Sequence, residues 1–141
     1  MTNQLLNMAC KCRANDPCLF EGQDMFVDIS ITNAQDTEVG FPLEYVQRSG
    51  PIVRLIDTRT KAVTSLKPNL ADPDLKKNIV RIHPGGSVNV EWVITSDEIQ
   101  QFEGPYVDLS AEFTVMAEVQ VRGKPVAFRG STTLRIVSGK R

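Results

Sequence analysis

The stretch from residue 107 to residue 121, VDLSAEFTVMAEVQV, alternates between apolar and polar side chains. Every odd position in it is apolar, and every even position except Met116 is polar. Because successive side chains of a β-strand point to opposite faces, this pattern predicts a strand with one buried side and one solvent-facing side. At about 3.4 Å per residue the strand would be roughly 50 Å long, well above the usual length.

The rest of the chain indicates short strands separated by turns. Alternation and apolar runs predict strands at 5–12, 25–32, 41–47, 51–63, 78–82 and 87–95, the third being weaker because Pro42 favours a strand edge or start. Segments 13–24 and 64–77 are predicted loops, and 96–102 a single helical turn capped by Ser96. About eight strands with almost no helix predict an all-β, antiparallel sandwich, a single domain over residues 1–141.

The last two strands form a predicted hairpin whose register follows from the residues. A two-residue turn at Gly123-Lys124 suits a type II′ hairpin, and facing residues then have numbers that add to 247. The facing apolar pairs would be Val121 with Val126, Val119 with Phe128, Phe113 with Leu134 and Ala111 with Ile136. A four-residue loop over 122–125 would keep the same pairs.

The end of this hairpin is the candidate interaction surface, because the arm is longer than a sandwich core needs. If the tip projects, its apolar side chains would form an exposed patch of the kind that marks interfaces. The candidate residues are Val119, Val121, Lys124, Val126 and Phe128. The favoured interpretation is nevertheless that loops 13–24 or 64–77 cover the apolar members, because monomers seldom leave large apolar patches bare. A third possibility is that the strand bends at a bulge near Gly130.

Charge and hydropathy limit the partners. The 141 residues carry 16 basic and 17 acidic side chains, so a net charge of −1 gives no reason to expect nucleic acid or an anionic membrane as partner. No apolar stretch approaches the roughly 20 residues that span a bilayer. The start, MTNQLLNMAC, does not resemble a secretory signal. We therefore expect a cytoplasmic protein, or a periplasmic or secreted one if a signal has been removed.

The three cysteines, Cys10, Cys12 and Cys18, lie close together in the sequence. Buried reduced thiols are the favoured interpretation, and a Cys12–Cys18 bridge is the alternative in an oxidising compartment. A zinc site that adds His83 to these thiols is disfavoured, since C-x-C is not the usual ligand spacing. We therefore expect no metal and no cofactor.

Catalytic signatures are absent from the sequence. His83 is the only histidine and lies in a glycine-rich turn, RIHPGG, where it should face solvent. No nucleophile elbow, phosphate-binding loop or dinucleotide fingerprint occurs. Trp92 has the pattern of a core residue, and Tyr106 that of a tyrosine corner whose hydroxyl bonds to the backbone. The chain is therefore predicted not to be an enzyme.

Three stretches together resemble bacterial immunoglobulin-like domains, in particular the family of intracellular subtilisin inhibitors. They are CLFEGQDMFVDISITNAQDTEV, VRLIDTRTKAV, and VRIHPGGSVNVEWVI followed by GPYVDLSAEFTV. The chain departs from the pattern at Leu19, Gln23 and Arg59, where an aromatic residue, glutamate and glycine are common. The resemblance implies an immunoglobulin-like sandwich of about seven to nine strands without catalytic activity, and suggests protease inhibition as one function.

The expected function is that of a non-enzymatic protein-interaction module. Its surface would be the hairpin end at 122–125 or the loops at 34–40, 64–77 and 83–86, because sandwiches present loops at their two ends. A homodimer through the C-terminal hairpin is one form this could take. The alternatives are an intracellular protease inhibitor acting through a loop such as 64–77, and an accessory carbohydrate-binding domain, which the scarcity of aromatic residues disfavours.

Overall fold

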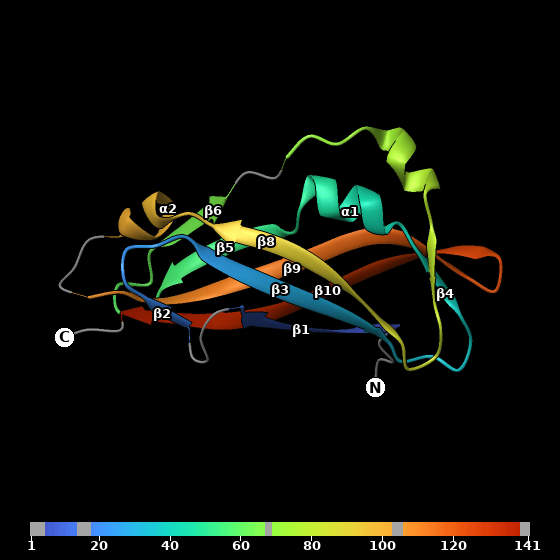
Figure 1. The fold of residues 1–141 in the computed structure, drawn as a ribbon, viewed down its shortest axis with the longest axis horizontal. Helices are drawn as coiled ribbons and strands as arrows, with labels where there is room; N and C mark the ends of the chain where they lie inside the picture. The colour runs from blue at the N-terminus through green and yellow to red at the C-terminus, as the bar shows by residue number, and fades with distance from the viewer. Residues whose placement is uncertain (1–4, 14–17, 67–68, 103–105, 139–141) are drawn as a thin grey trace.

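The computed structural model describes residues 5–13, 18–66, 69–102 and 106–138, most of which lie in strands (Figure 1). In chain order the strands are β1 (Leu6–Cys12), β2 (Cys18–Phe20), β3 (Met25–Asn33), β4 (Val39–Phe41), β5 (Ile52–Asp57), β6 (Val63–Leu66), β7 (Val80–Ile82), β8 (Ser87–Ile94), β9 (Asp108–Val121) and β10 (Lys124–Ser138). The helices are α1 (Leu43–Ser49), the 3-10 helix η1 (Pro73–Lys77) and α2 (Ser96–Gln100). The predicted all-β class is confirmed.

The strands form two sheets. The smaller has the order β1-β3-β8 and is antiparallel. The larger has the order β2-β10-β9-β4-β7, and β5 also pairs with β9 and carries β6 on its far side. Its described pairings are antiparallel except that β2 runs parallel to β10, so the prediction of purely antiparallel sheets is wrong there. Figure 1 shows the β9–β10 hairpin running the length of the molecule.

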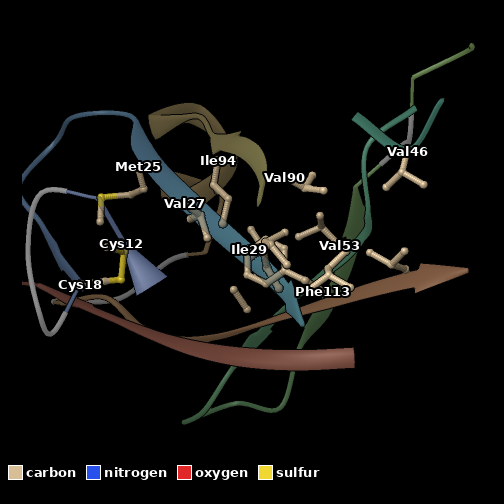
Figure 2. Packing of buried hydrophobic residues seen from close by; sticks show 14 of the residues in the cluster. Cys12, Cys18, Met25, Val27, Ile29, Val46, Val53, Val90, Ile94 and Phe113 are labelled. Carbon is tan, nitrogen blue, oxygen red and sulfur yellow. A yellow bond between two sulfur atoms is a disulfide. The ribbon is translucent and has the colours of Figure 1, made fainter. Parts of the chain in front are cut away.

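The hydrophobic core follows the predicted alternation. On β9 the odd positions Leu109, Phe113 and Val119 are buried, whereas Met116 and Glu118 are exposed. The buried positions of β3 and β8 belong to the same cluster (Figure 2). Burial of each of the larger apolar side chains contributes about 1.5–3 kcal/mol, which is what holds the two sheets together.

The hairpin register differs from the predicted one by two residues. Val121 faces Lys124, and Arg122 and Gly123 form the turn with φ values of 53° and 77°, as a type I′ turn requires. The predicted turn is wrong because its flanking pair would need a hydrogen bond from Pro125, which has no N–H. Since the side-chain period is two, the shift changes partners but leaves every side chain on its predicted face.

The segment predicted as a strand at 41–47 is instead helix α1. Its Val46 is buried on the core, and Leu43, three residues earlier, packs beside the same cluster. This three-residue spacing fits one face of a helix, and a segment this short does not distinguish the two periods. The predicted helical turn near 96–102 is confirmed as α2, although Thr95 rather than Ser96 caps it, in a capping box with Glu98.

The predicted loop at 13–24 contains β2, and a disulfide joins Cys12 at the end of β1 to Cys18 at the start of β2. Their Cα atoms are 5.6 Å apart, within the usual range for a bridge. The favoured expectation of reduced thiols is therefore wrong for these two cysteines, and Cys10 alone is free. Figure 2 shows the bridge at one end of the core, close to Met25.

Helix α1 is fixed to the outer edge of β8. The Gln47 side-chain N–H donates to the Glu91 backbone carbonyl at 2.8 Å, and the Glu91 backbone N–H donates to the Gln47 side-chain oxygen Oε1 at 2.9 Å. The Gln47 side chain thus occupies an edge of β8 that would otherwise offer free backbone groups.

At the end of α1, Gly50 has a φ of 77°, and a Cβ there would overlap the ring of Trp92. The close contact accounts for the half-buried Trp92, which lies against the core as predicted.

We predict that Gly50→Ala lowers the free energy of unfolding by about 3 kcal/mol, because it adds both left-handed strain and a clash with Trp92. The matched control is Gly123→Ala, which has the same φ of 77° but no neighbour within 4 Å, and should cost about 1 kcal/mol. Urea unfolding measures both values. Equal costs for the two variants would contradict the contact with Trp92.

We predict that the oxidised protein, denatured without reductant, takes up one alkyl group per chain, at Cys10. After reduction all three cysteines should react, which mass spectrometry detects. The double variant Cys12→Ala/Cys18→Ala should lose about 2 kcal/mol of stability, because the bridge closes a short loop. Three alkyl groups without reductant would contradict the bridge.

Candidate binding groove

On one edge of β9 the pairing with neighbouring strands has a gap. β4 pairs Gly40 with Gln120, and β5 pairs Ile52 with Thr114, so both lie along the same edge of β9. Between them, residues 41–51 bulge out and form α1, opposite residues 115–119 of β9. The sheet therefore has a gap at this edge. We call the unpaired edge of β9 at residues 115–119 the notch.

A cavity of about 340 Å³ opens at the notch. It is lined by Pro42, Tyr45, Lys76, Ile79, Met116, Ala117, Glu118 and Gln120. A second cavity of about 550 Å³ lies beside it toward the hairpin turn and is lined by Thr37, Glu38, Gly40, Lys77, Ile79, Arg81, Gln120, Arg122 and Gly123. Because Ile79 and Gln120 line both, the two cavities form one depression, which we call the β9 groove.

The β9 groove is positively charged although the chain as a whole is not. Four cations line it, Lys76, Lys77, Arg81 and Arg122, against the two carboxylates of Glu38 and Glu118, which gives a local charge of +2. Arg122 lies 3.5 Å from Asp36 and Lys77 lies 3.9 Å from Asp74. Exposed pairs of this kind are weak, so these side chains can exchange their partners for a ligand at little cost.

Apolar atoms complete the lining. Met116 is 56% exposed and Ile79 is 37% exposed, so both offer apolar surface to the groove. The Lys76 ammonium lies 4.9 Å from the centre of the Tyr45 ring, a cation–π contact. The groove therefore combines exposed apolar surface, one aromatic ring and cations, which is the chemistry of a recognition surface.

A buried asparagine holds one wall of the groove in place. The Asn33 side-chain N–H groups donate to the carbonyls of Thr37 and Ile82, each at 2.8 Å, and its side-chain oxygen accepts the Gln35 N–H at 2.8 Å. The amide thus ties the segment before β4 to the end of β7. Asn33 is 2% exposed, so loss of these bonds would leave buried polar groups unpaired.

The structure separates the five predicted surface residues. Val119 and Phe128 are buried in the core, Val121 and Val126 are half-buried, and Lys124 is exposed. Val119 and Phe128 belong to the hydrophobic core, so they cannot contact a partner. That loops 13–24 or 64–77 cover them stays a prediction. The predicted turn and loop segments nevertheless meet: 34–40, 64–77 and 122–125 each contribute residues to the β9 groove. The segment at 83–86 joins them through the His83 ring, whose Nδ1 lies 2.7 Å from Glu38.

The described residues contain no cluster that could hold a metal ion. The disulfide occupies two of the thiols of the disfavoured zinc site, and the His83 side chain is 77% exposed as expected. Burial raises the pKa of the remaining Cys10 thiol, which makes it a poor nucleophile at neutral pH.

Tyr106 is 47% exposed, and the Arg59 guanidinium lies 5.0 Å from the centre of its ring, so it does not have the buried position expected of a tyrosine corner.

Two carboxylates, Asp108 and Asp57, lie near the opposite end of β9, and each accepts hydrogen bonds from an arginine. Arg135 donates to both oxygens of Asp108, at 2.8 and 2.6 Å, and these hydrogen bonds hold the pKa of Asp108 below its ordinary value. The Arg59 backbone N–H donates to Asp57 and likewise lowers the pKa of that carboxyl. Both groups are ionised at neutral pH and occupied by hydrogen bonds, so neither is suited to act as a general acid.

We predict that the Asp108–Arg135 pair makes stability depend on pH in the acid range. The folded pKa of Asp108 is lower than its value of about 3.9 in the unfolded chain, so the contribution is complete above about pH 4 and is lost as pH falls through the folded pKa. Urea unfolding between about pH 2 and pH 6 should show a shallower acid decline in Arg135→Gln than in the parent. A decline of the same steepness in both proteins would contradict this role.

No helix of the described residues is both long and apolar enough to cross a membrane.

No protein-family model matches the chain, and no curated protein is significantly similar to it. Two kinds of solved structure match the chain weakly. The alkylpurine DNA glycosylase AlkC of Pseudomonas fluorescens, solved with DNA, matches over 96% of this chain and 31% of its own, with 8% identity and a TM-score of 0.42. A Listeria innocua β-glucosidase matches over 95% of this chain and 16% of its own, with 13% identity and a TM-score of 0.35. This chain spans less than a third of either, and similarities this weak assign no activity.

Proposed function

We propose that this chain is a non-enzymatic protein-binding module and that the β9 groove is its binding site. The observation that carries the proposal is the convergence of three separate segments, 34–40, 76–81 and 120–123, on one cationic and partly apolar depression. The depression is built on the central hairpin of the larger sheet, so a partner would meet a rigid surface.

The strand order supports an immunoglobulin-like assignment of the fold. In immunoglobulin-like sandwiches, strands one, two and five pair in one sheet, and strands three, six and seven in the other. Here β1, β3 and β8 form the first set, and β5, β9 and β10 the second. In this assignment the groove lies at the end of the sandwich where the sixth and seventh strands turn.

We predict that reversing the charge of the groove removes partner binding. Arg81→Glu/Arg122→Glu changes the local charge from +2 to −2 and leaves the buried core untouched, since both side chains are exposed. The matched control is Lys61→Glu, a charge reversal in the turn between β5 and β6 at the other end of the molecule.

The measurement is quantitative affinity capture with the parent, the double variant and the control. Partners of the groove should be retained by the parent and by Lys61→Glu, and depleted about tenfold or more with the double variant, since two cations at an interface contribute a few kcal/mol. Circular dichroism confirms that each variant is folded. A captured set that is unchanged by the double variant would rule out the β9 groove as the binding site.

The two other functions stay hypotheses. Protease inhibition would use the segment 64–77, of which residues 67 and 68 lie outside the described residues. Leu70 in this segment is fully exposed, and the Asn69 N–H donates to the Ser49 carbonyl at 3.0 Å, which anchors the segment to α1. Carbohydrate binding by an accessory domain has no comparable support, because Tyr45 is the one aromatic residue in the groove lining.

A further inference from the structure

The backbone of β9 directs its hydrogen-bonding groups alternately to its two edges. The Asp108 carbonyl accepts from the Thr58 N–H at 3.0 Å on the β5 side, and the Val107 carbonyl accepts from the Ser138 N–H at 2.9 Å on the β10 side. The β9–β10 register is constant from Asp108 to Val121. Even-numbered residues of β9 therefore present N–H and C=O toward β5 and β4, and odd-numbered residues present theirs toward β10.

Two even-numbered residues face the notch. Thr114 is paired with Ile52 and Gln120 with Gly40, but Met116 and Glu118 lie between these pairs. No described residue hydrogen-bonds to the N–H or C=O of either, whereas Ala117 between them is paired across to Phe128. Four backbone groups thus face the open strand edge, in the spacing of an antiparallel strand, and the two residues that carry them line the 340 Å³ cavity.

We propose that the notch binds a short, extended, acidic peptide segment of a protein partner, which pairs its main chain with Met116 and Glu118. This proposal rests on the proposed function of the β9 groove and specifies the chemistry of its partner. Unpaired donors and acceptors that alternate along a strand edge are complementary to another extended backbone and to few other ligands. The cations of the adjoining larger cavity, Lys77, Arg81 and Arg122, favour acidic side chains on the part of the segment that reaches them.

The size of the notch limits the segment. Five residues of β9, 115–119, separate the two paired regions, which corresponds to about 17 Å at 3.4 Å per residue. Because β4 and β5 close both ends, about three residues of the segment can pair in register. Side chains beyond them would reach the larger cavity, where Lys77, Arg81 and Arg122 lie.

Amide hydrogen exchange on the full ¹⁵N-labelled chain tests this proposal. In the free protein the amides of Met116 and Glu118 should exchange about tenfold or more faster than those of Ala117 and Val119, which are paired with β10. The probe is a pool of N-acetylated, C-amidated hexapeptides with aspartate or glutamate at alternate positions and apolar residues between them. We expect the pool to slow exchange at Met116 and Glu118 about tenfold, since each amide gains a partner.

Two control pools separate the sources of binding. A pool with lysine in place of the acidic residues should not slow exchange. An acidic pool with N-methylated backbones should bind at least about tenfold more weakly, because its backbone lacks N–H donors. Slow exchange of Met116 and Glu118 in the free protein would overturn the proposal.

The remaining outcomes distinguish the two proposals. If the acidic pool shifts the signals of Lys77, Arg81 and Arg122 but leaves exchange at Met116 and Glu118 unchanged, main-chain pairing is wrong and the groove remains a binding site. If no pool shifts any groove signal, the acidic segment is wrong as occupant, and the charge-reversal capture decides separately whether the groove binds another protein surface.

Discussion

The ladder between β9 and β10 is the constraint on which the rest of the molecule depends. It keeps one register from the Asp108–Val137 pair to the Val121–Lys124 pair, so the apolar side chains of both strands stay on one face of the hairpin. β2 joins the outer edge of β10, and β4 and β5 join that of β9. A slip of one residue would turn Leu109 and Phe113 toward solvent, so core burial and register stabilise each other.

The groove arises where this regular ladder meets irregular neighbours. β9 keeps one register with β10 past both neighbours, while the chain on its other edge leaves the sheet after β4, forms α1 and rejoins the sheet as β5. Two polar side chains make this departure stable: Gln47 fixes α1 to β8, and the buried Asn33 ties the segment before β4 to β7. The binding surface is thus held by hydrogen bonds between elements, and the core lies beneath it.

The sequence predicts what depends on period alone and misses what depends on distant contacts. The buried and exposed faces of β3, β8 and β9 are predicted correctly, because the alternation of apolar and polar residues within each strand determines them. The hairpin turn is wrong by two residues, although the missing N–H of Pro125 contains the information needed to place it. Helix α1 is missed because Pro42 can precede a strand as well as a helix, and because seven residues are too few to distinguish the two-residue period of a strand from the 3.6-residue period of a helix. The groove depends on the meeting of Gly40 with Gln120, which no local pattern encodes, and its one sequence signal is Met116, the apolar residue on the polar side.

The bulge between β4 and β5 has a consequence for how such a chain can diversify. Eleven residues, 41–51, stand opposite five, 115–119, which is six more than a continuous strand would need. Phe41, Pro42, Val46 and Pro51 are buried, and the other seven residues are half-buried or exposed. Changes in the length or composition of the bulge would reshape the opening while the scaffold persists, so descendants of one ancestor could acquire different recognition preferences without having to evolve a new architecture.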